Sequence, residues 1–209
     1  MYSKHLLALA TFFAIFLFSC DKNGISSLGG EISPMSQVGV TITSSSMEIS
    51  GVSSMSAEVT ALEDGISTVS GSAVVTNANF KNILSNFPEA EINGDQVNIT
   101  DLEFKQTTEG IASVKGLSPG IIVKYDAKVG DTYKTDDGER KVVSRSTDDD
   151  YFYGFFMIKV IEVEENLNKD GIKTIRYWAN HRFGLVGIEI TYDDNTVTKF
   201  PVYISAENE

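Results

Sequence analysis

Residues 170–200 read DGIKTIRYWANHRFGLVGIEITYDDNTVTKF, and this stretch decides the fold class. Over residues 186–192 apolar residues alternate with Gly, Glu and Thr, which is the period of two expected when a strand buries one face. Asp170-Gly171 and Asp194-Asn195 separate apolar-rich segments, and tight hairpin loops favour such residues because they tolerate positive φ. Pro201 cannot donate a hydrogen bond to a neighbouring strand, so the last strand is predicted to lie at a sheet edge.

The same kind of turn recurs upstream. Asp64-Gly65, Asn93-Gly94 and Asp137-Gly138 each stand between segments rich in β-branched and apolar residues. One such dipeptide is a weak signal, but a series of them flanked by strand-like segments favours an antiparallel meander. The sequence therefore predicts a mainly β fold of consecutive antiparallel strands.

Residues 76–87 form the one segment with helical periodicity. Thr76 or Asn77 can cap its first turn, and Pro88 follows its last residue. We expect a short amphipathic helix that covers one side of the sheet. Its apolar face carries Phe80, Ile83, Leu84 and Phe87.

The charge of the chain is strongly negative. It contains 29 Asp and Glu against 17 Lys and Arg, a net charge of −12. Nucleic-acid binding is disfavoured because contacts to phosphate groups need Lys and Arg. Direct adhesion to an anionic lipid surface is disfavoured for the same reason. The negative charge either holds the domain away from its membrane or serves solubility.

The N-terminus has the layout of a secretory signal. A short start with Lys4 precedes an uncharged, largely apolar stretch at 6–18, and Ser19 stands directly before Cys20. A membrane-spanning helix needs about 20 apolar residues, so this stretch is too short to be a transmembrane anchor, which is the alternative reading. Residues 1–19 are therefore predicted to be a signal peptide.

Leu17-Phe18-Ser19-Cys20 resembles a bacterial lipobox, and Cys20 is the only cysteine of the chain. Phe18 departs from the small residue usual at its position. The resemblance implies export, cleavage before Cys20 and a diacylglyceryl group with palmitate-like chains on its sulfur. Several buried acyl chains would hold the protein on a bilayer of the cell envelope, with the choice of inner or outer membrane left open.

Two further segments follow the predicted lipidation site. Residues 20–37 are rich in Ser, Gly and Pro and show no periodicity, so they are predicted to be a flexible tether. The alternative is that they include an edge strand. Residues 38–205 are predicted to form a single β-rich domain, a size sufficient for a substantial core.

Candidates for catalysis are few. His181 is the only histidine beyond residue 19, and its place between a strand and a glycine predicts a turn. A nucleophilic mechanism would need this imidazole beside a serine or thiol, yet the chain has no cysteine besides Cys20. A glycosidase would need two facing carboxylates, which cannot be chosen among 29 acidic residues. We therefore predict no catalytic residue and no cofactor.

Metal binding is also disfavoured. Zinc requires three or four His or Cys ligands, and beyond residue 19 the chain has only Cys20 and His181. Acidic runs at 136–137, 148–150 and 193–194 coincide with predicted turns, but none has the spacing of an EF-hand calcium loop. These carboxylates are predicted to be solvated, with a calcium site at clustered turns as the alternative.

Residues 151–158, YFYGFFMI, are the densest apolar feature. Aromatic side chains on such a strand would occupy both faces, so one face can enter the core while the other is covered or forms a binding patch. The strand containing Trp178 is expected to pair with this one across the Asp170-Gly171 hairpin. Either core packing or ligand contact explains the feature. The candidate ligand-binding residues are Tyr151, Phe152, Tyr153, Phe155, Phe156 and Trp178.

Tyr177-Trp178 followed by Phe183-Gly184-Leu185-Val186 is similar to strand–turn–strand endings in uncharacterised β-rich lipoproteins of the bacterial envelope. Val129-Gly130-Asp131 resembles a turn found in such chains. The resemblance implies a curved antiparallel sheet or partial barrel, weakly similar to the half-barrels that carry lipids or lipoproteins.

The predicted function is a non-enzymatic module that holds an apolar ligand or partner and is anchored to the membrane through Cys20. One alternative is a structural or assembly lipoprotein that recognises another envelope protein through a sheet edge. A hydrolase dependent on His181 is the third hypothesis. No nucleic-acid partner is expected.

Overall fold

The computed structural model describes residues 24–44 and 51–205. The predicted signal peptide 1–19 and lipidation site Cys20 lie outside these residues. Within the described ranges, no helix combines the length and the apolar character needed to cross a bilayer.

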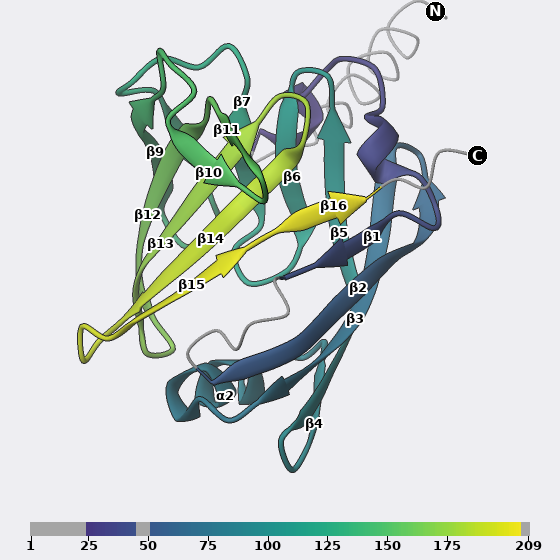
Figure 1. Ribbon diagram of the computed structural model, residues 1–209, viewed down its shortest axis with the longest axis vertical. Helices are drawn as coiled ribbons and strands as arrows, with labels where there is room; N and C mark the ends of the chain where they lie inside the picture. The colour runs from purple at the N-terminus through teal and green to yellow at the C-terminus, as the bar shows by residue number, and fades with distance from the viewer. Residues whose placement is uncertain (1–23, 45–50, 206–209) are drawn as a thin grey trace, which may run out of the picture.

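The protein is mainly β, with two antiparallel sheets that face each other (Figure 1). The first sheet is curled into a half-barrel and has the order β16-β1-β2-β3-β5-β6-β7, with β4 pairing separately with β5. Its strands are β1 (Thr41–Thr43), β2 (Val52–Glu63), β3 (Ile66–Val75), β4 (Ala90–Asn93), β5 (Gln96–Thr107), β6 (Gly110–Lys115), β7 (Gly120–Lys124) and β16 (Tyr203–Ser205). The predicted mainly β antiparallel fold, curved sheet included, is confirmed.

The second sheet has the order β15-β14-β13-β12-β9-β8 and lies across the open side of the half-barrel (Figure 1). A small hairpin, β10–β11, stands apart from both sheets. The strands are β8 (Thr132–Lys134), β9 (Glu139–Arg145), β10 (Tyr151–Tyr153), β11 (Phe156–Ile158), β12 (Ile161–Lys169), β13 (Ile172–Asn180), β14 (Gly184–Tyr192) and β15 (Val197–Pro201).

The two sheets are joined along both edges. At one edge the chain runs from β15, the edge strand predicted from Pro201, directly into β16, which pairs with β1 of the other sheet. At the other edge an isolated bridge links Gly120 of β7 with Thr135, just after β8. The sheets therefore enclose a common interior.

The turn residues act largely as predicted. Asp64-Gly65 joins β2 to β3, and Asp170-Gly171 joins β12 to β13, with all four residues at positive φ. Between β4 and β5 the two-residue loop is Gly94-Asp95, one residue later than predicted, because Asn93 pairs with Gln96 as the last residue of β4.

The predicted helix is present as α2 (Ala78–Ser85). Asn77 caps it, since its side-chain oxygen accepts a hydrogen bond from the Phe80 amide. Ile83 and Leu84 are buried, and the Phe80 ring lies 5.1 Å from that of Phe200 on β15. The helix thus covers one end of the interior, between the two sheets (Figure 1).

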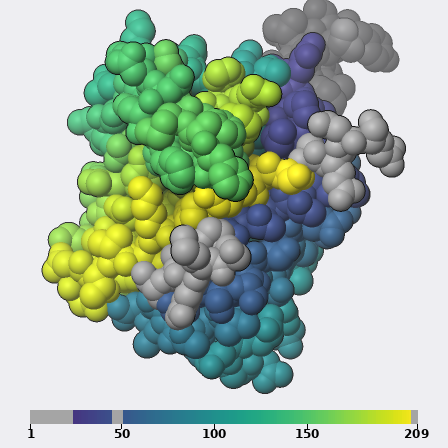
Figure 2. Space-filling model, in the orientation of Figure 1, coloured from purple at the N-terminus to yellow at the C-terminus, as the bar shows by residue number. Residues whose placement is uncertain are grey.

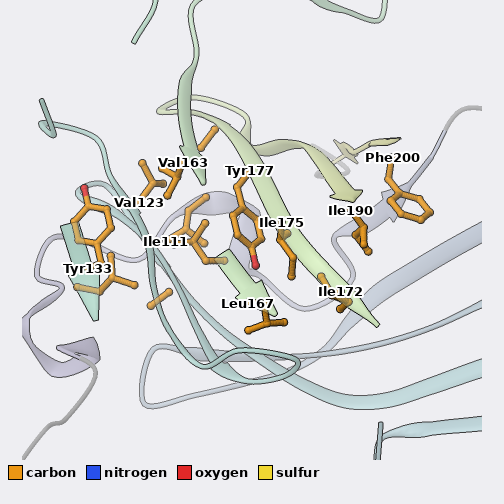
Figure 3. Packing of buried hydrophobic residues seen from close by; sticks show 14 of the residues in the cluster. Ile111, Val123, Tyr133, Val163, Leu167, Ile172, Ile175, Tyr177, Ile190 and Phe200 are labelled. Atoms are coloured by element: carbon orange, nitrogen blue, oxygen red, sulfur yellow. The ribbon is translucent and has the colours of Figure 1, made fainter. Parts of the chain in front are cut away.

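A single large cluster of buried apolar side chains is built from both sheets and the helix. Figure 3 shows side chains of β6 and β7 lying beside those of the second sheet. Burial of apolar area at roughly 25 cal/mol per Å² makes this shared core the main stabilising contribution. Its most fully buried members include Val75, Val123, Val142, Val163 and Ile172.

The expected tether differs from the structure over residues 24–37. Leu28 is fully buried, Ile32 forms a bridge with Thr107, and the Ser33 amide donates to the carbonyl oxygen of Gln106. Two short 3₁₀ turns, η2 (Ile25–Ser27) and η3 (Pro34–Ser36), shape the segment. Its apolar residues are spaced irregularly, so they carry no periodic signal, although Leu28 is buried and Ile25 and Met35 are half-buried on the domain.

Candidate functional site

The main candidate site is an apolar cavity of about 190 Å³ on the concave side of the half-barrel. Val59, Val69 and Leu102 contribute from the half-barrel, and Leu185 and Ile188 contribute from β14 of the facing sheet. Only three of its sixteen lining residues have polar side chains. Such a space suits an apolar ligand, because few polar groups would lose their water on binding.

Small residues explain why the interior is not filled. Where β2 and β3 cross the interior, they present Ala57 and Ser67 to this cavity. They present Gly71 and Ala73 to a second apolar cavity beside it. Gly71 pairs with Ala57, and a Cβ atom added to Gly71 would lie only 2.5 Å from the Cβ of Ala57. The strands therefore run close together with little side-chain volume above them, which leaves space beneath the second sheet.

A second apolar cavity of about 170 Å³ adjoins the first. The two share Met55, Ala57, Val69 and Leu102 as lining residues. Phe80 and Leu84 of α2 line the second cavity, so the helix closes its far end. Together the cavities follow the concave face from the helix toward the N-terminal segment.

That N-terminal segment forms part of the first cavity's wall. Met35 and Ser36 line the cavity. Ser36 donates through Oγ to the carbonyl oxygen of Gln106 at 3.0 Å, and Ser67 donates through Oγ to the carbonyl oxygen of Ser36 at 2.9 Å. The segment expected to be a tether is therefore a structural part of the candidate site.

The aromatic stretch 151–158 lies elsewhere and folds differently from the prediction. Instead of a single strand paired with β13, it doubles back at Gly154, where φ is +65°, to form the β10–β11 hairpin. The strand that pairs with β13 across the Asp170-Gly171 hairpin is β12, with Glu162 opposite Trp178. The hairpin lies over the outer face of the second sheet, in front of β14 (Figures 1 and 2).

Three of the six candidate ligand-binding residues attach this hairpin to the sheet. Tyr153 and Trp178 are buried in a small cluster with Val186, and Tyr151 stacks on Trp178 with ring centroids 6.1 Å apart. The Lys199 ammonium group lies 4.0 Å from the Trp178 ring centroid, a cation–π contact. Burial raises the pKa of Tyr151 to about 12. These side chains form a small hydrophobic cluster that is separate from the main core.

The other three candidates are exposed. Phe155 is 100% exposed at the hairpin turn, Phe152 is 66% exposed and Phe156 is 49% exposed. Met157, 46% exposed, extends the apolar surface. The six predicted residues therefore divide into a packing side and an exposed phenylalanine ridge, and none of them lines the apolar cavities.

A buried polar network near β7 was not found by sequence reasoning. The guanidinium Nε of Arg140 donates to Oε2 of Glu165 at 2.9 Å, and each side chain is only 1% exposed. Arg140 also donates to the carbonyl oxygens of Ser118, Gly120 and Ile121. A signal did exist, because Glu165 occupies an inward position of β12 between Val163 and Leu167.

His181 and the acidic turns do not form a metal-binding group in the described ranges. His181 is exposed after β13. Among the described residues there is no group of three or more His, Cys, Asp or Glu side chains placed to hold a metal ion. Comparison with protein-family models, with curated proteins and with solved structures gave no match.

Proposed function

We propose that this chain is a non-enzymatic binding module of the bacterial cell envelope, anchored through lipid on Cys20, that holds an apolar ligand within its half-barrel. The observation that supports it most is the apolar cavity of about 190 Å³ with its neighbour of about 170 Å³. Each exceeds an apolar cavity of roughly 150 Å³ that stays dry and binds benzene.

The energetics favour occupancy. An empty cavity weakens a fold by roughly 24 cal/mol per Å³, so the cavity of about 190 Å³ carries a cost of up to about 5 kcal/mol. A ligand that fills the space recovers contacts that the small side chains of β2 and β3 do not supply. Acyl chains or other flexible hydrocarbons fit an elongated apolar space better than rigid polar molecules do.

The test is a substitution that fills the cavity. Val69 lines both cavities and is buried, so Val69→Phe should occupy the space. Val197→Phe is the matched control, because Val197 is 47% exposed on the edge strand β15 and lines neither cavity. Native mass spectrometry of the full chain, together with titration of an apolar fluorescent probe, reports occupancy.

We expect the Val69→Phe variant to lose the co-purifying ligand and probe binding, while Val197→Phe retains both. Retention of the ligand by a folded Val69→Phe variant would contradict the proposal.

A second candidate function is favoured by the exposed ridge of Phe152, Phe155 and Phe156. In this alternative the chain is an assembly lipoprotein that recognises another envelope protein through the β10–β11 hairpin. A photo-crosslinking residue at position 155 in intact cells should then give one dominant protein adduct. The same residue at Val129, which is 62% exposed in the loop between β7 and β8, is the control position.

A further inference from the structure

A third cavity, of about 200 Å³, differs from the other two in its lining. Arg145, Lys159 and His181 contribute to its wall, and none of its nine lining residues is acidic. In a chain with 29 acidic residues against 17 Lys and Arg, such a lining runs against the overall charge. The cavity is therefore a local cationic site in an anionic protein.

The three basic side chains of this cavity come from three separate parts of the second sheet and its loops. Arg145 is the last residue of β9, Lys159 lies between β11 and β12, and His181 follows β13. Nη1 of Arg145 donates to the carbonyl oxygens of Tyr125 and Ala127 at 2.9 and 2.8 Å. These bonds orient the guanidinium group while its remaining N–H groups stay available.

Asn180 holds the backbone next to Lys159 and His181. It is 7% exposed, and its amide nitrogen donates to the carbonyl oxygen of Lys159 at 2.8 Å. Its side-chain oxygen accepts from the amides of Arg182 and Phe183, which fixes the turn that carries His181. The backbone around the cavity is thus held before any ligand arrives, which lowers the cost of binding.

In the described part of the chain, the basic side chains at the cavity have no acidic partner. Within residues 24–44 and 51–205, neither Lys159 nor His181 has an ion pair or a side-chain hydrogen bond, and Arg145 has no ion pair. Asp150 is nearby, but its carboxylate accepts from Ser146, which lines the cavity. Tyr125 also lines the wall, and its hydroxyl is buried without a hydrogen-bond partner.

We propose that this cationic cavity binds a phosphate group. Two permanent cations and an imidazole match the charge of a phosphate monoester, about −1.5 to −2 at neutral pH, better than that of a single carboxylate. A guanidinium fork suits the spacing of phosphate oxygens. The phosphate belongs either to a free small molecule or to the headgroup of an amphiphile.

The apolar cavity is close enough to make an amphiphile a real alternative. Ala179, which lines the cationic cavity, pairs across the sheet with Leu185, which lines the apolar one. The phosphate site itself does not depend on the proposed function, whereas the amphiphile alternative does.

The experiment titrates inorganic phosphate into the full purified chain and its variants, with binding measured by calorimetry. Lys159→Gln and His181→Asn remove groups that have no structural partner, so these variants should fold. Lys128→Gln is the matched control, because Lys128 is exposed and lines no part of the cavity. We expect about tenfold weaker phosphate binding for Lys159→Gln, as for loss of one charged hydrogen bond, and less than twofold change for Lys128→Gln.

Two outcomes overturn the site: no phosphate binding by the native chain, or equal weakening by Lys128→Gln, which would indicate only long-range attraction. Parallel titration with lysophosphatidate distinguishes the sources. A headgroup source predicts tighter binding than phosphate, weakened by both Lys159→Gln and Val69→Phe; a free phosphate source predicts no such gain. If the apolar cavity binds no ligand, Val69→Phe should have no effect, while Lys159→Gln should still weaken the binding of inorganic phosphate.

Discussion

Arg140 on β9 and Glu165 on β12 form an ion pair buried between the two sheets, with Nε and Oε2 2.9 Å apart. Ser118 donates to the other carboxylate oxygen at 2.6 Å, and the guanidinium group lies 5.1 Å from the Tyr177 ring centroid. Arg140 also donates to the carbonyl oxygens of Gly120 and Ile121 on β7. The pair therefore ties the second sheet to the edge of the half-barrel.

Removing one partner of this pair should be strongly destabilising, because the other charge stays buried without compensation. We expect Glu165→Leu to lower the free energy of unfolding by about 3–5 kcal/mol. The double variant Arg140→Met with Glu165→Leu should recover much of that loss, since no buried charge remains. Urea denaturation of the native chain, the two single variants Arg140→Met and Glu165→Leu, and the double variant measures both effects. A double variant as unstable as the sum of the two singles would refute this account.

Tyr177 gives the protein a stability that declines at alkaline pH. Burial raises the pKa of its hydroxyl to about 12, against about 10 in the unfolded chain. The folded state therefore keeps its proton longer, so this contribution is complete below pH 10 and is lost as the pH rises toward 12.

Between those pH values the hydroxyl should cost up to about 1.4 kcal/mol of stability per pH unit. Tyr177→Phe should flatten the decline, while Tyr203→Phe serves as a control for a half-buried tyrosine. Urea denaturation at pH 9.5 and pH 11 checks the difference. Equal slopes for the native chain and Tyr177→Phe would show that other groups dominate.

Substitutions on the two sides of the β10–β11 hairpin should differ in their effect on stability. Tyr153 is buried against Phe183 and Tyr203, with ring centroids 5.1 and 5.2 Å away, so Tyr153→Ala should destabilise the protein by about 3 kcal/mol. Phe155 is 100% exposed, so Phe155→Ala should change the melting temperature little. Thermal unfolding measures both, and a large effect of Phe155→Ala would mean that the ridge packs against part of the chain.

The architecture could be predicted to a large extent because short-range patterns determine it. Tight turns such as Asp170-Gly171 and the helical period around Ile83 are local signals, and both were correct. The folding of 151–158 could not be predicted in the same way, since a stretch with aromatic residues on both sides of Gly154 satisfies either a strand or a hairpin.

The apolar cavity left no sequence signal of this kind. It arises because β2 and β3 carry small side chains where they face the interior, and because Leu185 of β14 lines the same cavity as these strands, which come much earlier in the sequence. The buried Glu165 did leave a sequence signal, because a charge at an inward position of an alternating strand needs a partner. Finding Arg140 as that partner requires the strand pairing of β9 with β12.

The predicted acylation of Cys20, which would connect this fold to a membrane, can be tested directly. Leu28 is buried on the domain only eight residues further along, so even a fully extended chain allows at most about 28 Å between them. A lipid on Cys20 would therefore keep the domain near the bilayer surface. Metabolic labelling with a palmitate analogue, in a bacterial host that expresses the full chain, should mark the native chain. It should not mark a Cys20→Ser variant, which should also retain residues 1–19 because the lipobox resemblance implies cleavage after lipid transfer. Label on the variant, or a native chain that stays unlabelled, would show that the domain is held at the membrane by other means or not at all.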